Sequence, residues 1–194
     1  MKTDSEKKLR IFTIGHSNLS FEQFLSLLKE FGIRLIADIR WYPGSRKFPH
    51  FNREKLCEAL AAENIVYLWL EALGGRRHNE KNEKSQNTGL KSPGFRNYAD
   101  YMATDEFHLA IQELLSAAAT MRTAVMCAEK LYWKCHRKLL SDYLVTQGLE
   151  VIHIIGPGKL LGHKLTPFAV TTDNGIIYPP PEPCDMQKSF FDPE

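Results

Sequence analysis

The residues of this chain best suited to covalent chemistry lie between Cys127 and Arg137. This segment leads from a predicted buried strand into a predicted helix, and the free N–H groups of a helix N-terminus bind anions and lower the pKa of a neighbouring thiol. Cys127, at the strand end, is a candidate thiolate nucleophile, with Glu129 or His136 to move the proton. Arg137 falls in the first helical turn, where a cation opposes the helix dipole, so we expect it to bind a phosphate or a carboxylate.

Two other interpretations of this segment fit its spacing less well. Cys-based phosphatases and sulfurtransferases share the strand–loop–helix order, but their five-residue spacing between Cys and Arg is absent. Cys127, Cys135 and His136 could ligate zinc, yet an offset of eight residues is not a zinc-knuckle spacing, and adjacent ligands are awkward. We therefore predict no metal and no cofactor, and place Cys135 and His136 among the substrate-binding residues.

Polar residues also follow the other predicted strands. Ligands of parallel α/β folds bind at the carboxyl ends of the strands, so we expect these residues to share one pocket with Cys127. Asp38 is a candidate acid or base and His16 a polariser or proton carrier; the structural alternatives are a carboxylate locked to an arginine and a satisfied core histidine. The remaining candidate substrate-binding residues at these strand ends are Ser17, Arg40, Ser45, Gly74, Gly75 and Arg76.

Strands that alternate with helices must position these residues. Apolar runs predict strands over residues 11–14, 35–39, 65–70, 123–127 and 150–154. Helices are predicted after a Ser20/Gln23 capping box, over 53–63, after Thr104, and through Leu144 to a stop at Gly148. This order indicates an α/β fold, with a five-stranded, mainly parallel sheet that is either three-layered or a partial barrel. Residues 74–97 are expected to form a long polar loop, and 169–178 a hairpin.

Composition sets the limits of the fold and of its setting. With 194 residues, 43% of them hydrophobic, the chain is expected to form one domain over residues 1–178, followed by a Pro-rich tail over 179–194. No apolar run approaches the length of a membrane helix, residues 1–10 lack the core of a secretory signal, and four cysteines are too few for a disulfide scaffold. We expect a reduced, cytoplasmic protein with no membrane partner.

Five short motifs give the chain a family resemblance. They are Gly15-His16-Ser17, Asp38-Ile-Arg40 with Pro43-x-Ser45, Leu73-Gly-Gly75, Cys127-Ala-Glu129, and Cys135-His-Arg137. As a set they resemble the signature segments of the Domain of Unknown Function 488 family over about residues 10 to 156, with Ile39 where Val is common. The resemblance implies an α/β domain with a polar pocket and supplies no reaction.

Charge and aromatic residues point to an anionic substrate. The net charge of +2 excludes a uniformly basic, histone-like binder, so any anion site must be local. Residues 40–53 and 74–97 each carry a net charge of +4, and both segments follow strand ends. Aromatic side chains lie among these cations, as in grooves that stack bases and neutralise phosphates. The alternative is a solvated surface whose aromatic residues anchor the loops.

The end of the tail suggests a macromolecular partner. Residues 187–191 resemble the short peptides with which bacterial repair and replication proteins bind the DNA sliding clamp, and the residues concerned are Gln187, Phe190 and Phe191. An exposed Phe-Phe pair on a polar tail is costly unless it docks on its own domain or on a partner. We therefore predict the sliding clamp as a partner.

Together these features predict an enzyme that acts on nucleic acid or on a nucleotide-like anion, plausibly in DNA repair or modification. Arg40, Arg76 and Arg137 would hold the anion. One alternative is a non-catalytic nucleic-acid-binding or clamp-associated adaptor. The other is a sulfurtransferase-like thiol enzyme for a small molecule. Salt-dependent DNA binding would separate the first two from the third.

Overall fold

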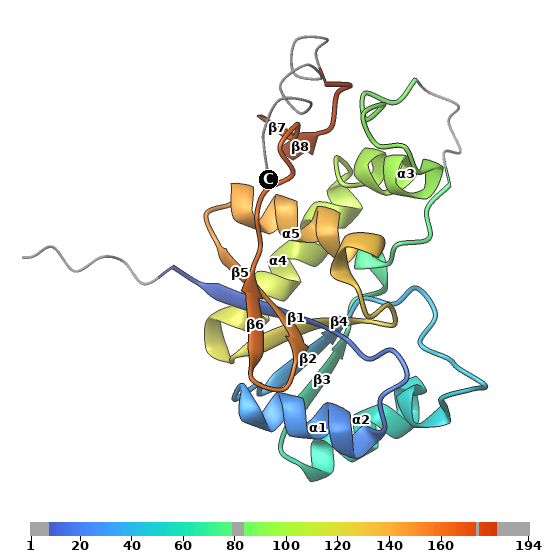
Figure 1. The fold of residues 1–194 in the computed structure, drawn as a ribbon, viewed down its shortest axis with the longest axis vertical. Helices are drawn as coiled ribbons and strands as arrows, with labels where there is room; N and C mark the ends of the chain where they lie inside the picture. Colours follow the sequence, from blue (N-terminus) through green and yellow to red (C-terminus); the bar gives the residue numbers. More distant parts are fainter. Residues whose placement is uncertain (1–7, 79–83, 174, 182–194) are drawn as a thin grey trace, which may run out of the picture.

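The computed structural model describes residues 8–78, 84–173 and 175–181. Its centre is a six-stranded sheet of order β3-β2-β4-β1-β5-β6, shown in Figure 1. The strands are β1 (Arg10–Gly15), β2 (Leu35–Asp38), β3 (Val66–Trp69), β4 (Thr123–Cys127), β5 (Glu150–Gly156) and β6 (Lys159–Gly162). The first five are parallel, and β6 pairs antiparallel with β5. Loops after β1, β2, β3 and β4 therefore meet at one edge of the sheet, the carboxyl edge.

Helices cover both faces of the sheet (Figure 1). The five α-helices among the described residues are α1 (Phe21–Glu30), α2 (Arg53–Ala62), α3 (Pro93–Tyr101), α4 (Asp105–Thr120) and α5 (Arg137–Thr146). Short 3-10 turns, η1 (Pro49–Phe51), η2 (Glu71–Leu73) and η3 (Tyr132–Lys134), lie in the loops of the carboxyl edge. A separate hairpin, β7 (Val170–Thr172) and β8 (Gly175–Ile177), follows β6.

The ends of the helices follow from local sequence. Ser20 caps α1 through a full capping box with Gln23, and the Thr104 side chain accepts from the backbone N–H of Phe107 at the start of α4. Gly32 and Gly148, just past the ends of α1 and α5, have φ of 63° and 84°, a conformation that favours glycine. These stops return the chain to the sheet, as predicted.

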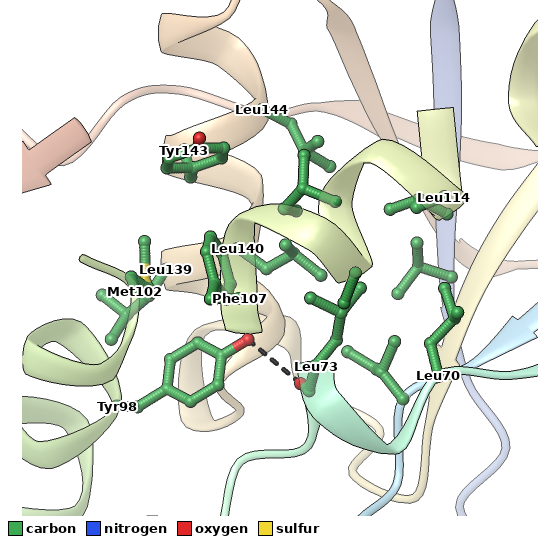
Figure 2. Packing of buried hydrophobic residues seen from close by; sticks show 14 of the residues in the cluster. Leu70, Leu73, Tyr98, Met102, Phe107, Leu114, Leu139, Leu140, Tyr143 and Leu144 are labelled. Atoms are coloured by element: carbon green, nitrogen blue, oxygen red, sulfur yellow. Dashed lines mark hydrogen bonds between the residues drawn. The ribbon is translucent and has the colours of Figure 1, made fainter. Parts of the chain in front are cut away.

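Two apolar clusters fill the layers on either side of the sheet. Side chains alternate along β2, so Ile36 packs with α1 and α2, whereas Leu35 and Ala37 pack with α4 and α5. Figure 2 shows the second cluster, in which α3, α4 and α5 meet the turn after β3. There the buried Tyr98 hydroxyl donates to the Leu73 carbonyl at 3.1 Å, which fixes α3 to η2.

The structure confirms the α/β class and the C-terminal hairpin, and corrects three details. Lys159–Gly162 adds a sixth strand that was not predicted, because its exposed residues show no alternation. The sheet is open, with β3 and β6 at its edges, so it is a three-layered sheet and not a partial barrel. The predicted loop over 74–97 contains the start of α3, which Pro93 opens at its first position.

None of the helices in the described part of the chain is both long enough and apolar enough to cross a membrane.

Candidate functional site

The predicted site residues do not share one pocket; they divide between the two faces of the sheet. Asp38 follows Ala37 on β2 and so lies on the α1/α2 face, whereas Cys127 packs in the apolar cluster on the α4/α5 face. We call the first group, His16, Asp38, Arg40 and Tyr67, the ion-pair cluster. We call the second group, Cys127, Cys135, His136 and Arg137, the thiol cluster.

The ion-pair cluster is centred on a fully buried carboxylate. Asp38 accepts from Arg40 Nε at 2.9 and 3.0 Å on its two oxygens, from the Arg40 backbone N–H at 3.0 Å, and from the Tyr67 hydroxyl at 2.6 Å. Arg40 is 7% exposed. Its own carbonyl accepts from the Trp69 indole at 3.0 Å. The cluster thus ties the loop after β2 to the edge strand β3, and every Asp38 oxygen is occupied.

His16 completes this cluster as a neutral ring. Arg40 can only donate, so His16 Nε2 accepts from it at 3.3 Å, and Nδ1 carries the proton and donates to the Ser17 carbonyl at 3.1 Å. The imidazole stacks on Phe51 with ring centroids 4.0 Å apart. Burial, and then the charge of Arg40, lower the pKa of His16 from 6.5 to about 4.

The thiol cluster brings two sulfurs and an imidazole together. Cys127 is the last residue of β4, and η3 turns the chain back so that Cys135, just before α5, lies in the same buried cluster. One donor atom from each of Cys127, Cys135 and His136 lies within 4.8 Å of the other two. Cys135 Sγ and His136 Nδ1 are 3.6 Å apart.

The two thiols differ in their tendency to ionise. A hydrogen bond from Cys127 lowers the pKa of Cys135 well below its usual value, and the neighbouring His136 and Arg137 act in the same direction. The same hydrogen bond, together with burial, raises the pKa of Cys127. The thiol with the lowered pKa is thus Cys135, near the N-terminus of α5, whereas the candidate nucleophile from the sequence, Cys127, has a raised pKa.

Arg137 holds the returning loop in place. Its side chain is 1% exposed and donates to the carbonyls of Glu129 and Lys130, the latter at 3.2 Å. Its Nε has no partner among the described residues. Two of the three side-chain nitrogens of Arg137 thus already donate to protein oxygens. This structural role is an alternative to the predicted binding of an anion.

A buried hydrogen-bonded relay runs from Arg137 to a carboxylate on the same helix. With both rings neutral it has one consistent direction: Arg137 donates to Thr13 (3.4 Å), Thr13 to His153 (2.7 Å), His153 to His163 (2.9 Å), and His163 to Asp142 (2.8 Å). Burial, and then the repulsion that a protonated His153 would feel from a protonated His163 and from Arg137, lower the pKa of His153 to about 3. Thr166 and Tyr178 also donate to Asp142, at 2.7 and 3.0 Å.

The glycines of two motifs make room for these groups. A Cβ at Gly75 would overlap the ring of His136, and a Cβ at Gly15 would overlap the Glu129 carbonyl and crowd Arg137. A Cβ at Gly74 would crowd the backbone of Trp41. The predicted role of Gly74 and Gly75 in substrate binding stays a prediction; the structure shows that they let η2 pack between Trp41 and His136.

The other predicted residues occupy the loops of the carboxyl edge. Glu129 and Arg76 are exposed, Ser17 has φ of 48° and donates to Asn18, and the Ser45 hydroxyl accepts from Phe48 N–H. The peptide Gln187, Phe190 and Phe191 lies outside the described residues.

Sequence reasoning gave no role to most of the relay. Asp142 carried the best available signal, an acidic residue among apolar helical positions such as Leu139, Leu140 and Tyr143. His163 and Thr13 carried none, because only the tertiary fold brings them to Asp142 and His153.

No curated protein and no solved structure matches the chain. One family model, "Domain of unknown function DUF488", matches residues 20–144. The match spans α1 to most of α5 and so includes the thiol cluster and all of the ion-pair cluster except His16. Because it covers more than half of the sequence, the chain belongs to the DUF488 family.

Proposed function

We propose that the protein is an enzyme that acts on nucleic acid or on a nucleotide-like anion at the carboxyl edge of its sheet. The reacting groups belong to the thiol cluster, because the ion-pair cluster has no free acceptor for acid–base work. The observation that carries the proposal is the contiguity of the buried thiol cluster with exposed cations and aromatic rings.

Exposed cations and rings lie on three loops of the carboxyl edge, the edge at which the thiol cluster lies. We call them the rim. The loop after β4 carries Lys130, Trp133 and Lys134, all exposed, within eight residues of Cys127. The loop after β2 carries exposed Trp41, Tyr42, Arg46 and Lys47, and Arg76 follows η2. Trp41, 40% exposed, abuts Gly74, and the adjacent Gly75 abuts His136, so the loops are in contact.

The exposed cations of the rim differ from the basic residues that serve the fold. Arg40 is paired with Asp38, Arg53 stacks on Trp69 at 4.1 Å, and Arg77 lies over Tyr101 and Trp41 at 3.6 and 4.6 Å. Arg46, Arg76, Lys130 and Lys134 remain to neutralise phosphates, and so does Lys47, although its ammonium lies over the Phe48 ring at 5.4 Å. Tyr42 is 78% exposed and Trp133 48%, so both rings have faces free to stack on bases.

Fluorescence anisotropy with a labelled single-stranded DNA, its duplex and the matching RNA tests the binding step. We expect affinity to fall with salt, and Arg46→Gln with Lys47→Gln to lower the log–log salt slope by about 1 to 2. Trp133→Ala should weaken single-strand binding by about tenfold. The matched control is Arg34→Gln, an exposed cation at the amino edge of the sheet. Equal effects of the control and the rim variants would overturn the proposal.

Mass spectrometry of the nucleic acid after incubation tests the catalytic step. A covalent change that wild type makes and Cys135→Ser does not would support the enzyme. Rim-dependent binding with no change in any of the three substrates would favour the non-catalytic adaptor. A thiol-dependent reaction without nucleic-acid binding would favour the small-molecule thiol enzyme.

A further inference from the structure

We propose that Cys127, Cys135 and His136 form a binding site for one divalent metal ion of the zinc class. This inference does not rest on the proposed substrate. It rests on the convergence of three donor atoms within 4.8 Å of one another, two of them on buried cysteines and one on the half-buried His136.

The separation of the donors fits tetrahedral coordination. Zinc bonds of about 2.3 Å to sulfur and about 2.0 Å to nitrogen place two such ligands roughly 3.5 Å apart at the corners of a tetrahedron. Cys135 Sγ and His136 Nδ1 are 3.6 Å apart. The third donor, Cys127, lies within 4.8 Å of both, so a small side-chain adjustment would complete the face.

The fold explains why the eight-residue offset does not prevent ligation. Zinc-knuckle spacings apply to ligands on one tight turn, whereas here Cys127 ends a strand and Cys135 precedes a helix. The segment between them doubles back through η3, and Arg137 fixes it by binding the carbonyls of Glu129 and Lys130. An offset of eight residues is therefore compatible with zinc ligation in this fold.

The imidazole is held in place but is not satisfied by the protein. Gly75 lies directly against the ring, and Tyr98 meets it edge-on with centroids 5.1 Å apart. Nδ1, the nitrogen that would bind the metal, contacts no other polar side chain among the described residues than Cys135 Sγ, itself a proposed ligand, and Nε2 has no partner there. Buried histidines that serve structure, such as His153 here, have partners on both nitrogens. A fixed and unsatisfied imidazole beside two sulfurs suits a ligand role.

The donor set selects the class of ion. Two thiolates and an imidazole prefer zinc and similar soft or borderline ions over magnesium or calcium, which take oxygen ligands. Two thiolates also offset the charge of a divalent ion next to cationic Arg137. Three protein ligands leave the fourth position open, as in catalytic zinc sites and unlike closed structural ones. A water or a substrate oxygen could take that position.

Metal loading of the full-length protein tests the proposal. Chelator-treated, reduced protein is dialysed against Zn²⁺ or Co²⁺, and the bound metal is counted by mass spectrometry. We expect one ion per chain, and for Co²⁺ the strong visible bands of tetrahedral coordination with a sulfur-to-metal charge-transfer band. Cys135→Ser should weaken binding at least tenfold and reduce the charge-transfer band. Cys57→Ser, at an exposed cysteine of α2, should change neither.

A second variant keeps the test decisive where Cys135→Ser fails to fold. Gly75→Ala retains all three ligands but displaces His136, so it should weaken Co²⁺ binding while circular dichroism shows a folded domain. Substoichiometric metal in wild type, or equal loading of wild type and Cys135→Ser, would overturn the proposal. Anisotropy of the metal-free protein with DNA is recorded in parallel, so that failure of the metal site and failure of the proposed substrate are distinguished.

Discussion

The ion-pair cluster and the thiol cluster lie at the same edge of the sheet, on opposite faces, and they use their polar atoms differently. In the ion-pair cluster, both oxygens of Asp38 and both nitrogens of His16 have partners. In the thiol cluster, His136 Nε2 and Arg137 Nε are buried without partners in the described protein. Apart from Tyr67, both groups come from motif residues, so motif membership alone does not distinguish a structural clamp from a reactive site.

What distinguishes the two clusters is whether their buried polar atoms all have partners within the protein. A buried polar group whose hydrogen-bonding atoms all have partners in the protein can only stabilise the fold. A buried polar group with an unpartnered atom can bind a ligand or a metal ion. By this criterion Asp38, Arg40 and His16 hold the loop after β2, and the thiol cluster is the part of the site open to chemistry.

Loss of the Asp38 carboxylate should have the largest effect. Asp38→Ala leaves Arg40 buried and uncompensated, which costs about 3 to 5 kcal/mol of the free energy of unfolding. Urea denaturation of wild type and variant measures this loss in the free energy of unfolding. The matched control is Glu150→Ala, which removes the partner of Arg10 in an exposed pair at 2.7 Å and should cost less than about 1 kcal/mol. Similar losses for the two variants would remove the structural assignment of the ion-pair cluster.

Acid should destabilise the protein through His16. Its pKa is 6.5 when unfolded and about 4 when folded, so between these values the unfolded chain binds more protons and stability falls as the pH falls. Over that window the loss from His16 is about 3 kcal/mol, since one pKa unit corresponds to about 1.4 kcal/mol. The difference in pH slope between wild type and His16→Gln isolates this residue from His153. Parallel slopes would mean that His16 titrates normally in the folded protein.

Gly75→Ala should cost about 1 to 3 kcal/mol of stability, because the new methyl group overlaps the ring of His136. Gly162→Ala on β6 is the control, since a Cβ there meets no atom within 4 Å. Thermal unfolding compares the two variants. If Gly75→Ala were no more harmful than Gly162→Ala, the close fit between η2 and the thiol cluster would not be a constraint.

Removal of residues 187–194 should have the smallest effect on the domain, within about 0.5 kcal/mol. The sequence-based hypothesis is that Gln187, Phe190 and Phe191 bind a sliding clamp, so the same truncation should abolish clamp binding in surface plasmon resonance. Phe190→Ala with Phe191→Ala in the full chain is the matched variant. A truncated protein that unfolds would instead assign the two rings to the core and end the clamp hypothesis.

The sequence predicted the parts of the fold that local rules determine. The capping box at Ser20, the cap at Thr104 and the stops at Gly32 and Gly148 gave the βα alternation, and hence the edge at which polar residues collect. Strand β6 was not predicted because its exposed leucines show no alternation of polar and apolar residues. Helix α3 was not predicted because its polar residues are typical of a loop.

The candidate site was predicted as a set of residues but not as an arrangement. Carboxyl-edge loops were placed correctly, yet the face onto which each side chain turns depends on the strand register, which no motif encodes. The convergence of Cys127 with Cys135 depends on the turn at η3, and the relay depends on contacts between residues more than 100 positions apart, such as Thr13 and His153.

The relay also bears on how the chain folds as it is synthesised. The family match ends at residue 144, yet the carboxylate of Asp142 finds its partners in His163, Thr166 and Tyr178, which emerge from the ribosome later. Until they arrive, a nascent domain of five strands would bury an unpaired anion inside α5. The segment that ends at Tyr178 therefore supplies the hydrogen bonds that the buried carboxylate of Asp142 needs. A chain released before this segment is made would keep an unpaired buried charge, and chaperones and proteases can recognise such a destabilised product.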